Sequence, residues 1–406
     1  MAVTVRLMQE EYFANQAAAL PAFTQRTGID VTASMLAIDL DLNDPFIHGA
    51  RAAFGDPPRW DLMAPENGLI ASSIANGLVE PLGERIARDG FDIDDFPAAA
   101  LAAYGGGDEI CAVPYMAMSN VLIYRKDLLE RYGLPVPQTW EELRRVALEA
   151  QAALRRDGIT EVVGFTGRGL AGYGHNFWIV GSTLFPSWGW EWDRGPGEPP
   201  RVYEPATVDA LAFYAALLQE AGPADSPRMM FIEIHKFYAA GSAVFFVDTA
   251  TELATMRDAN QDSPGNVSGM ALVPAGPTGR REPGLYCPAL CIPRSSTVKE
   301  EAWQLLRYLA TPEEFLREAV EAGYAEVART SVIESAAYAA AYDADFVDVV
   351  RQTRSIAREN RPVIRQYLEL GDIVGAAATA AIAGERSAEE ALRAAQREID
   401  AMEWAG

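Results

Sequence analysis

One glycine-rich segment has the residue types and spacing of a dinucleotide-binding site. Residues 167–172 (GRGLAG) fit the pattern G-x-G-x-x-G, follow a strand-like segment at 162–166, and precede Glu191 by about 20 residues. In a dinucleotide-binding domain the glycines let the backbone approach the pyrophosphate, and a regular helix opens at the third glycine. Here residues 173–176 are expected to continue the loop. We therefore predict a flexible loop at 167–172 and keep an NAD-dependent enzyme as a remote alternative.

Other residues with catalytic potential do not form a recognisable enzyme motif. The chain has three histidines, His48, His175 and His235, and contains no G-x-S-x-G, H-E-x-x-H or P-loop sequence. The carboxylates at 39–41 and 92–95 stand in polar segments and are expected to be solvated. A glycosidase needs two carboxylates that face each other across a cleft, and this second remote alternative stays open. We predict a protein that is not an enzyme and that uses no cofactor.

The cysteines do not have the spacing of a metal site. Cys111, Cys287 and Cys291 form no C-x-x-C pair and have no flanking histidines. We therefore predict no metal and three buried free thiols. A bridge from Cys111 to either Cys287 or Cys291 remains an alternative.

Size and charge exclude several classes of protein. With 406 residues, the chain exceeds the roughly 250–300 residues at which one core usually stops growing, so two lobes are expected. The formal net charge of −23 would repel phosphate backbones, so we predict no nucleic-acid partner. The sequence contains no apolar run of ~18 residues and no basic segment followed by an apolar segment at its start.

Strand-like and helix-like segments alternate along the chain, which is typical of an α/β protein. Strands are predicted at 3–8, 29–34, 60–64, 120–124, 162–166 and 242–247. Helices are predicted to end at Gly28 and Gly133 and to occupy 69–75, 140–157 and 206–220. Pro21 is expected to kink or shorten the first of these helices.

Two further local patterns predict structure. Capping boxes, in which a Ser or Thr is followed three residues later by Glu, are predicted to begin helices at Thr139, Thr297, Thr311 and Ser387. Between 188 and 192, tryptophans alternate with Gly189 and Glu191, which predicts a strand with one covered face.

A long ordered string begins at Ala112 and reads AVPYMAMSNVLIYRKDLLERYGLPVPQTWEE. It resembles the lobe-crossing segment of extracellular solute-binding protein family 1 of ABC importers, the maltose-binding-protein-like group of carbohydrate uptake. Three more segments resemble elements of this family: WDLMAPENGLIASSIANGLVEPL from Trp60, GSAVFFVDTA from Gly241 and GLYCPALCIPRSSTVKEEAWQLLRYLATPEE from Gly284. The resemblance extends through most of the chain.

The resemblance implies an α/β, two-lobed periplasmic-binding-protein-like fold of type II, with mixed sheets flanked by helices and a ligand cleft between the lobes. Lobe 1 is expected at 1–112 with 272–321, and lobe 2 at 113–271 with 322–406, so the crossings fall near 113, 271 and 322.

The resemblance also implies where the solute is bound, because this family places ligand residues just after strand ends. Aromatic faces stack on the C–H patches of a sugar, while carboxylates, amides and Arg hydrogen-bond its hydroxyls. The candidate ligand-binding residues are Glu10, Tyr12, Glu66, Asn67, Tyr115, Met118, His175, Asn176, Trp178, Trp190, Asp248, Thr249, Tyr286 and Arg329.

Structural roles remain open for several of these residues. Glu66 and Asn67 have the chemistry of a helix N-terminus, and Glu10 and Tyr12 that of a solvated first turn. For Tyr115 the alternative to solute contact is packing at the hinge, and for Trp178 it is packing in the core. For Arg329 the alternative is a structural role. Met118 stands where many sugar binders of this type carry an acidic residue, and residues 371–372 stand where maltose-binding protein offers an aromatic. A different or smaller ligand is therefore expected.

These observations predict the substrate-binding component of an ABC transporter. It would capture a carbohydrate (mono- or oligosaccharide) or polyol by hinge closure and deliver it to a membrane permease. A cationic solute such as a polyamine is the alternative, because Glu10, Glu66 and Asp248 could line an acidic crevice. The resemblance implies a monomer, located in the periplasm or held at the cell surface as a lipoprotein. The export signal is then expected to be absent from this chain.

Overall fold

The structure is a computed structural model that describes residues 3–10, 16–36, 58–65, 67–105, 110–172, 175–192, 198–257, 260–358 and 366–404. The chain divides into two compact units. Unit 1 comprises 1–118, 286–343 and 363–368, and unit 2 comprises 119–285, 344–362 and 369–406. The boundaries between the units fall after residues 118, 285, 343, 362 and 368.

The strands of unit 1 form small pieces of sheet. β1 (Thr4–Glu10) and β2 (Asp30–Leu36) are parallel neighbours, and helix α1 (Leu20–Thr27) connects them. β3 (Ala112–Pro114) runs antiparallel to β9 (Ala289–Cys291). The strand predicted at 60–64 is present as single bridges, one of them the parallel bridge between Leu62 and Leu7.

The other helices of unit 1 are α4 (Asn67–Ala75), α5 (Gly83–Asp89), α6 (Ala98–Ala103), α14 (Lys299–Leu309), α15 (Pro312–Glu321), α16 (Thr330–Ile333) and α17 (Ala336–Ala341). Pro21 does not interrupt the helix as predicted, because α1 begins at Leu20 with this proline in its first turn. At that place the missing N–H of proline would have had no helical partner.

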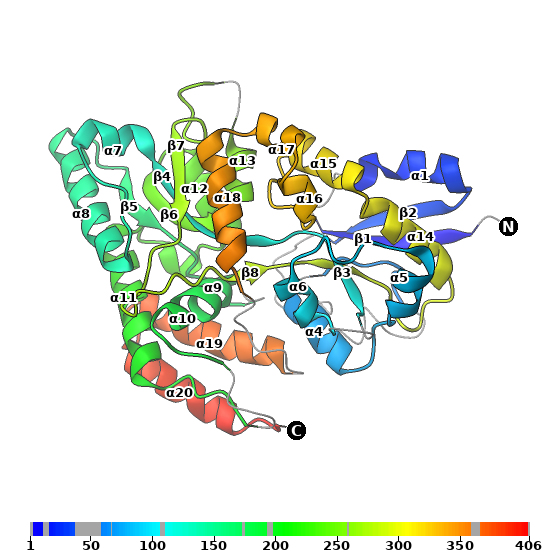
Figure 1. Cartoon of the computed structure of the whole chain (residues 1–406). Helices are drawn as coiled ribbons and strands as arrows, with labels where there is room; N and C mark the ends of the chain where they lie inside the picture. The colour runs from blue at the N-terminus through cyan, green and yellow to red at the C-terminus, as the bar shows by residue number, and fades with distance from the viewer. Residues whose placement is uncertain are drawn as a thin grey trace. The chain divides into compact units, whose positions relative to one another are not determined.

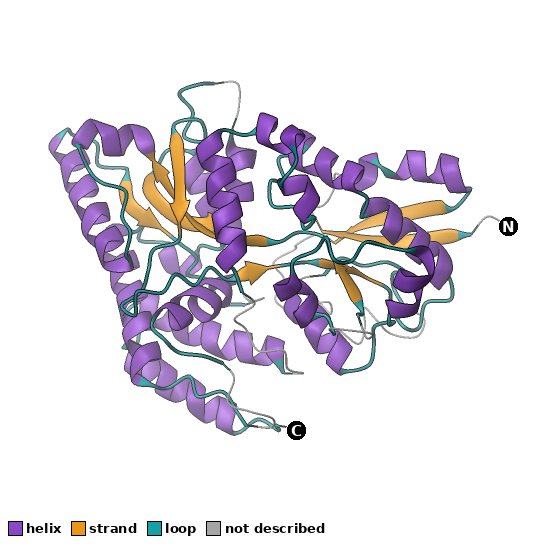
Figure 2. Cartoon of the chain, in the orientation of Figure 1, coloured by secondary structure: helices purple, strands orange, loops and turns teal. Residues whose placement is uncertain are grey.

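Unit 2 is built on one mixed sheet with strand order β5-β6-β4-β7, and β8 (Leu285–Tyr286) also pairs with β4. The strands are β4 (Met118–Arg125), β5 (Val163–Thr166), β6 (Ala243–Thr249) and β7 (Ser268–Leu272). β5 runs parallel to β6, whereas β4 runs antiparallel to both β6 and β7. Helices flank this sheet on both faces, as Figure 2 shows.

Residues 126–257 supply one set of helical elements in unit 2. They are α7 (Lys126–Tyr132), α8 (Trp140–Arg156), α9 (His175–Ile179), the π-helix η3 (Val180–Leu184), α10 (Phe185–Ser187), α11 (Pro205–Ala221), the 3-10 helix η4 (Ser226–Arg228), α12 (Phe231–Ala239) and α13 (Ala250–Met256). The C-terminal part adds α18 (Ala344–Ile356), α19 (Tyr367–Ile382) and α20 (Ala388–Asp400). α18 packs along β7, and α20 packs along α11 (Figure 1).

Helix α8 shows why an amphipathic sequence forms this part of the fold. Its apolar residues recur at helical spacing from Trp140 to Leu154 and are buried, while the charged residues face outward. Thr139 caps the helix by accepting a hydrogen bond from N–H of Glu142 at 3.1 Å. The Glu142 carboxylate accepts from N–H of Gln138 at 2.7 Å, so the reciprocal half of the predicted capping box is displaced by one residue.

The other predicted capping boxes have mixed outcomes. Ser387 and Glu390 form the complete reciprocal box, and Thr311 accepts from N–H of Glu314 at 3.3 Å. The box predicted at Thr297 is wrong, because Val298 is the N-cap of α14. The hydroxyl of Ser296 accepts from N–H of Val298 at 3.3 Å, but this N–H belongs to the N-cap itself, so no side chain of the described residues caps α14.

The strand predicted at 188–192 is also wrong. α10 ends at Ser187 and a turn follows, in which Gly189 adopts a positive φ of 87°. Trp190 and Trp192 are nevertheless buried, and their rings meet edge-on with centroids 4.5 Å apart. Packing of two indoles, and not strand pairing, therefore produces the alternating burial of this segment.

The three cysteines lie in unit 1, are buried and form no disulfide, as predicted. Burial raises the pKa of the Cys291 thiol, with a smaller contribution from Cys111. Among the described residues, no group of His, Cys, Asp or Glu side chains is arranged to hold a metal ion. Within the same residues, no helix combines the length and the apolar character that a membrane crossing requires.

Candidate functional site

Polar side chains of unit 2 gather at one edge of its sheet. β5 and β6 are parallel, so Thr166 and Thr249 end their strands at the same edge. β4 is antiparallel to β6, and Asn120 near its start pairs with Thr249. In open α/β sheets, ligands bind beyond the carboxyl ends of parallel strands. This edge is therefore the candidate functional site of unit 2.

The two faces of the sheet carry different groups to this edge. Residues paired across a ladder share a face, so Thr249 lies on the face of Asn120, whereas Asp248 lies on the face of Val121. Helix α12 covers the Asp248 face, since His235 packs edge-on against Phe246 with ring centroids 6.0 Å apart. On the other face, Nδ2 of Asn120 donates to the hydroxyl of Thr183 in the π-helix at 2.6 Å.

Arg168 follows Gly167 in the loop after β5, and contacts with other side chains fix its guanidinium. Its Nε donates to Oδ2 of Asp248 at 3.0 Å, and its Nη2 donates to Oδ1 at 2.8 Å. The guanidinium carbon also lies 4.5 Å from the centroid of the Trp178 ring and 5.4 Å from that of Phe231. Within the described part of the chain, Nη1 of Arg168 has no hydrogen-bond partner. One nitrogen of a rigidly held cation therefore remains available as a donor.

Asp248 is enclosed by positive charge. Its side chain is 0 % exposed, and the Arg168 side chain is 12 % exposed. Burial acts to raise the pKa of Asp248, but the charges of Arg168 and His235 outweigh burial and lower this pKa to about 2. Asp248 is therefore ionised at neutral pH, and its oxygens are already engaged by protein groups.

His235 lies between two carboxylates. Its Nε2 is 3.2 Å from Oδ2 of Asp248, and its Nδ1 is 2.8 Å from Oε2 of Glu252. Burial acts to lower the pKa of His235, but Glu252 and Asp248 outweigh burial and raise it to about 9. The imidazole is thus an imidazolium at neutral pH, and the buried cluster has two positive and two negative groups.

Four buried oxygens around this edge have no hydrogen-bond partner among the described residues. They are Oγ1 of Thr166, Oγ1 of Thr249, Oδ1 of Asn120 and Oδ1 of Asn176. More than nine in ten buried polar groups in proteins are hydrogen-bonded, so such a concentration is unusual. Hydroxyls and amide oxygens of this kind are the groups that would hydrogen-bond a hydroxylated solute.

The glycine motif at 167–172 has a packing role. A Cβ on Gly169 would lie 2.0 Å from the carbonyl oxygen of Ser226, and one on Gly167 would lie 2.5 Å from the hydroxyl of Tyr214. The loop is further tied to α19, because Nδ2 of Asn176 donates to the carbonyls of Gly169 and Gly375 at 3.1 and 2.9 Å. These close contacts explain Gly167 and Gly169, and the positive φ of 93° explains Gly172, without a phosphate ligand.

Residues 175–176 correct one sequence-based expectation. They do not continue the loop, because α9 begins at His175. This helix has only five residues and passes directly into the π-helix, unlike the long helix that a dinucleotide fingerprint requires.

Several predicted site residues of unit 2 lie near the edge just described. Asp248 and Thr249 end β6, Asn176 anchors the following loop, and Trp178 stacks on Arg168. Trp190 is buried instead in the indole pair described above, where its Nε1 donates to the carbonyl of Arg201 at 3.0 Å. The side chain of His175 is outside the described structure.

The predicted site residues near the crossing and in unit 1 are mostly packed. Tyr115 is buried against Phe315, with ring centroids 5.4 Å apart, and burial raises the pKa of its hydroxyl. Arg329 donates from Nη1 to Asp95 at 2.8 Å and from Nε to the carbonyl of Ala310 at 2.6 Å. These contacts favour the structural alternative for both residues.

Other candidates are partly described. Met118 is a buried residue at the start of β4, and Tyr286 is half-buried in β8. Tyr12 and Glu66 lie outside the described residues. Glu10 ends β1 and Asn67 begins α4, but the described structure does not extend to their side chains.

The sequence reasoning missed Arg168, His235 and Glu252 as members of the site. A signal existed for Arg168, since it is a charged residue two positions after the apolar strand 163–166. Glu252 is only four positions after Asp248, so a local signal existed for it as well. His235 stands on another helix, 13 positions before Asp248, and no local spacing connects it with the site.

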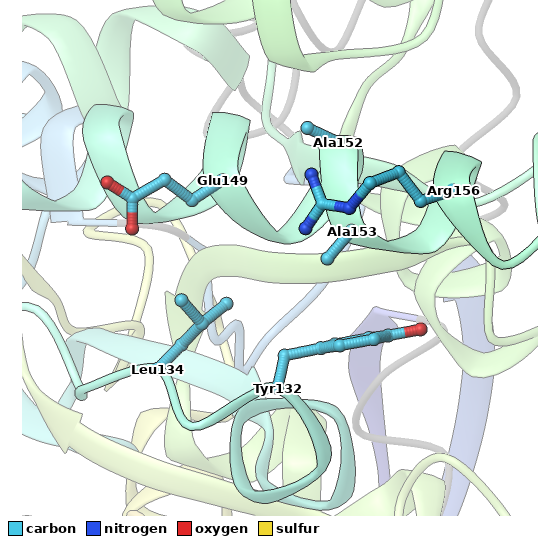
Figure 3. Close-up of a pocket in the computed structure, with 6 residues that line it drawn as sticks. All are labelled: Tyr132, Leu134, Glu149, Ala152, Ala153 and Arg156. Atoms are coloured by element: carbon cyan, nitrogen blue, oxygen red, sulfur yellow. The ribbon is translucent and has the colours of Figure 1, made fainter.

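A shallow pocket of about 280 Å³ lies elsewhere in unit 2, between the end of α7 and helix α8. Figure 3 shows Tyr132 and Leu134 on one side of it and Ala152, Ala153 and Arg156 on the other. None of the polar residues of the sheet edge lines this pocket.

Comparison with known proteins points to one family. The sequence profile described as "Bacterial extracellular solute-binding protein" matches residues 11–314. A mannitol-binding protein of Pseudomonas aeruginosa is 28% identical over 341 residues, which cover 80% of this chain and 76% of the relative. A probable ABC transporter-binding protein of Deinococcus radiodurans is 31% identical over 234 residues, which cover 56% of this chain and 54% of that protein.

Solved structures show the same fold. An ABC transporter solute-binding protein of Agrobacterium radiobacter K84, in complex with ribitol, is 25% identical and superposes with a TM-score of 0.85 over 98% of both chains. The maltose-bound MalE3 of T. maritima is 22% identical, with a TM-score of 0.83 over 98% of this chain and 99% of that chain. The predicted two-lobed type II periplasmic-binding-protein fold is thereby confirmed.

Proposed function

Because the chain belongs to the bacterial extracellular solute-binding protein family, we propose that it captures a polyol or a small carbohydrate and delivers it to the permease of an ABC importer. The observation that carries this proposal is the similarity to the mannitol-binding protein, which spans most of both chains. The ribitol complex of the Agrobacterium radiobacter protein supports the same class of solute.

The sheet edge of unit 2 supports a neutral, hydroxylated solute. Nη1 of Arg168 offers fixed donors, and the hydroxyls of Thr166 and Thr249 both donate and accept. A polyol hydroxyl also donates and accepts, so it can match both kinds of partner. We propose that these three residues and Asn120 contact the solute.

The same geometry disfavours the cationic alternative in unit 2. An amine would need an available carboxylate, but Asp248 is fully buried and its oxygens are engaged by Arg168 and His235. The guanidinium of Arg168 at this edge is 12 % exposed and would repel a polyamine. A polyol faces no such repulsion.

The proposal extends to the place and mode of action. The protein would act outside the cytoplasmic membrane, in the periplasm or as a lipoprotein, as a monomer that meets its permease. It would release its solute chemically unchanged, since family members are binding proteins.

A thermal-shift screen followed by calorimetry tests this function. The panel contains mannitol, ribitol, sorbitol, tagatose and maltose, with putrescine and spermidine as the amine set. A bound polyol at 100 times its dissociation constant stabilises the protein by roughly 2.7 kcal/mol. NMR of the released solute after long incubation should show the intact starting compound.

The salt dependence of binding separates the two solute classes. The affinity for a neutral polyol should be unchanged between low salt and about 0.5 M salt, where the screening length is only several ångströms. Stabilisation by the amines alone, with affinity falling tenfold or more over this range, would overturn the proposal.

A further inference from the structure

Behind the sheet edge, four charged side chains form a cluster, although Arg168 is the one proposed to contact the solute. Asp248 ends β6, His235 lies in α12, Glu252 is in the first turn of α13, and Arg168 is in the loop after β5. Four separate elements therefore place one charged side chain each in a connected row. The order of contacts is Glu252, His235, Asp248 and Arg168.

The orientation of Arg168 depends on the plane of the Asp248 carboxylate. The guanidinium is planar, and its Nε and Nη2 match the two carboxylate oxygens as a fork. The rings of Trp178 and Phe231 hold the guanidinium by stacking but leave it free to turn within its own plane. The carboxylate therefore decides where the available Nη1 points.

The carboxylate in turn has few other restraints. Oδ1 of Asp248 accepts from N–H of Thr249 at 3.0 Å in addition to Arg168. Oδ2 faces Nε of Arg168 on one side and Nε2 of His235 on the other. Among the described residues, Nε2 of His235 forms no hydrogen bond, so its contact with Oδ2 at 3.2 Å is a charge contact, and His235 restrains Oδ2 electrostatically from the side of α12.

Glu252 contacts the ring nitrogen of His235 that does not face Asp248. In the described part of the chain, the Glu252 carboxylate has one polar side-chain partner, Nδ1 of His235 at 2.8 Å. Since a carboxylate oxygen faces each ring nitrogen, both nitrogens must carry protons. A neutral imidazole would leave one nitrogen lone pair directed at a carboxylate. Glu252 therefore keeps His235 in the doubly protonated form that can hold Asp248.

We propose that His235 and Glu252 are positioning residues for solute binding, which orient the Arg168 guanidinium through Asp248. This inference rests on the proposed function, because it assigns Arg168 to the solute. His235 and Glu252 do not themselves touch the solute in this arrangement. They act through the carboxylate that they fix.

The pH dependence of affinity follows from the groups around His235. The charged side chains that face it are Asp248 from β6 and Glu252 from α13, with Arg168 beyond Asp248; Phe231 and Phe246 supply aromatic contacts. Loss of the imidazolium proton at alkaline pH would remove the restraint on Asp248. Solute affinity should therefore be constant from pH 6 to 8 and fall as pH rises above about 9.

The test compares two variants that each replace a charged side chain of the cluster by a neutral amide, with D-mannitol as the probe. Glu252→Gln removes the charge that keeps His235 doubly protonated, and His235→Gln removes the imidazolium. Each is expected to weaken mannitol binding at least tenfold in calorimetry. The double variant, in which two amides replace the opposite charges, should recover part of this loss, because the charge balance of the cluster is restored.

A matched control and a spectroscopic readout separate positioning from general stability. Glu149→Gln breaks the exposed pair with Arg145 and should change mannitol affinity less than twofold. The Nε–H resonance of Arg168, assigned with Arg168→Lys, should shift in Glu252→Gln even without solute. It should stay unchanged in Glu149→Gln.

The outcomes distinguish the two proposals. If Arg168→Lys loses mannitol affinity while Glu252→Gln binds within twofold of the wild type, the positioning role is refuted and the proposed function stands. If the wild type binds no polyol or sugar, the proposed function is refuted. In that case an unchanged Arg168 Nε–H resonance in Glu252→Gln also refutes the positioning role. Should His235→Gln fail to fold, the milder Glu252→Gln decides the question.

Discussion

Replacement of Asp248 by Asn is the most direct test of the buried cluster. The change keeps the size of the side chain and removes its negative charge. Arg168 and His235 then remain buried as two cations, with Glu252 as the one adjacent anion. The charges left behind are poorly hydrated, because the side chains of Arg168 and His235 are only 12 % and 10 % exposed.

The expected loss of stability is large. Breaking a buried ion pair by removal of one partner costs about 3–5 kcal/mol. For a unit of roughly 150–250 residues, each kcal/mol lowers Tm by about 2–4 °C, so the melting temperature should fall by roughly 6–20 °C. This loss of unfolding free energy exceeds the net stabilisation by the intact ion pair, because it also includes the desolvation penalty of the cation that is left unpaired.

The matched control is an exposed pair of the same geometry. Arg144 donates from Nε and Nη2 to Glu220 at 2.9 and 2.5 Å, and the two side chains are 38% and 41% exposed. Because water solvates both partners, Glu220→Gln should cost about 0–1 kcal/mol.

Urea unfolding and calorimetry at pH 7 measure both variants. The m-values should match that of the wild type, so that the midpoints report stability alone. If Asp248→Asn loses no more stability than Glu220→Gln, burial of the cluster does not have the energetic role argued above. That result would also weaken the case that Asp248 orients Arg168.

Three further predictions concern titratable groups. His235 has a pKa raised to about 9 in the folded protein, so its stabilising effect is complete below its unfolded pKa of 6.5 and is lost as pH rises through 9. Urea unfolding should show this decline in the wild type and not in His235→Gln. Burial raises the pKa of Glu318 to about 7, so the folded state favours its protonated form and stability should decrease between pH 4.5 and 7. Glu318→Gln should remove that decrease, and an unchanged profile would contradict the assignment. The thiols of Cys111, Cys287 and Cys291 are buried, so a thiol reagent should label none of them in the native protein and all three in urea. Rapid labelling under native conditions would show that this part of unit 1 opens.

The sequence was sufficient for features that depend on local pattern. The apolar runs predicted strands that the structure confirms as β1, β2, β4, β5 and β6, since such a run is a property of a few consecutive residues. Helix α8 follows from its apolar period, and the box at Ser387 from two residues three positions apart. The ordered string from Ala112 identified the family, which the sequence profile confirms.

Only the tertiary structure decided the partners of Asp248. The residue lies at a strand end as predicted, but Arg168 is 80 positions away in the chain and reaches it because β5 and β6 are parallel neighbours. His235 arrives from a helix packed on one face of the sheet, and the charge of Glu252 then fixes its protonation. A sequence pattern records which residues could bear charge. Whether water or another side chain neutralises that charge depends on burial, which contacts between distant segments determine.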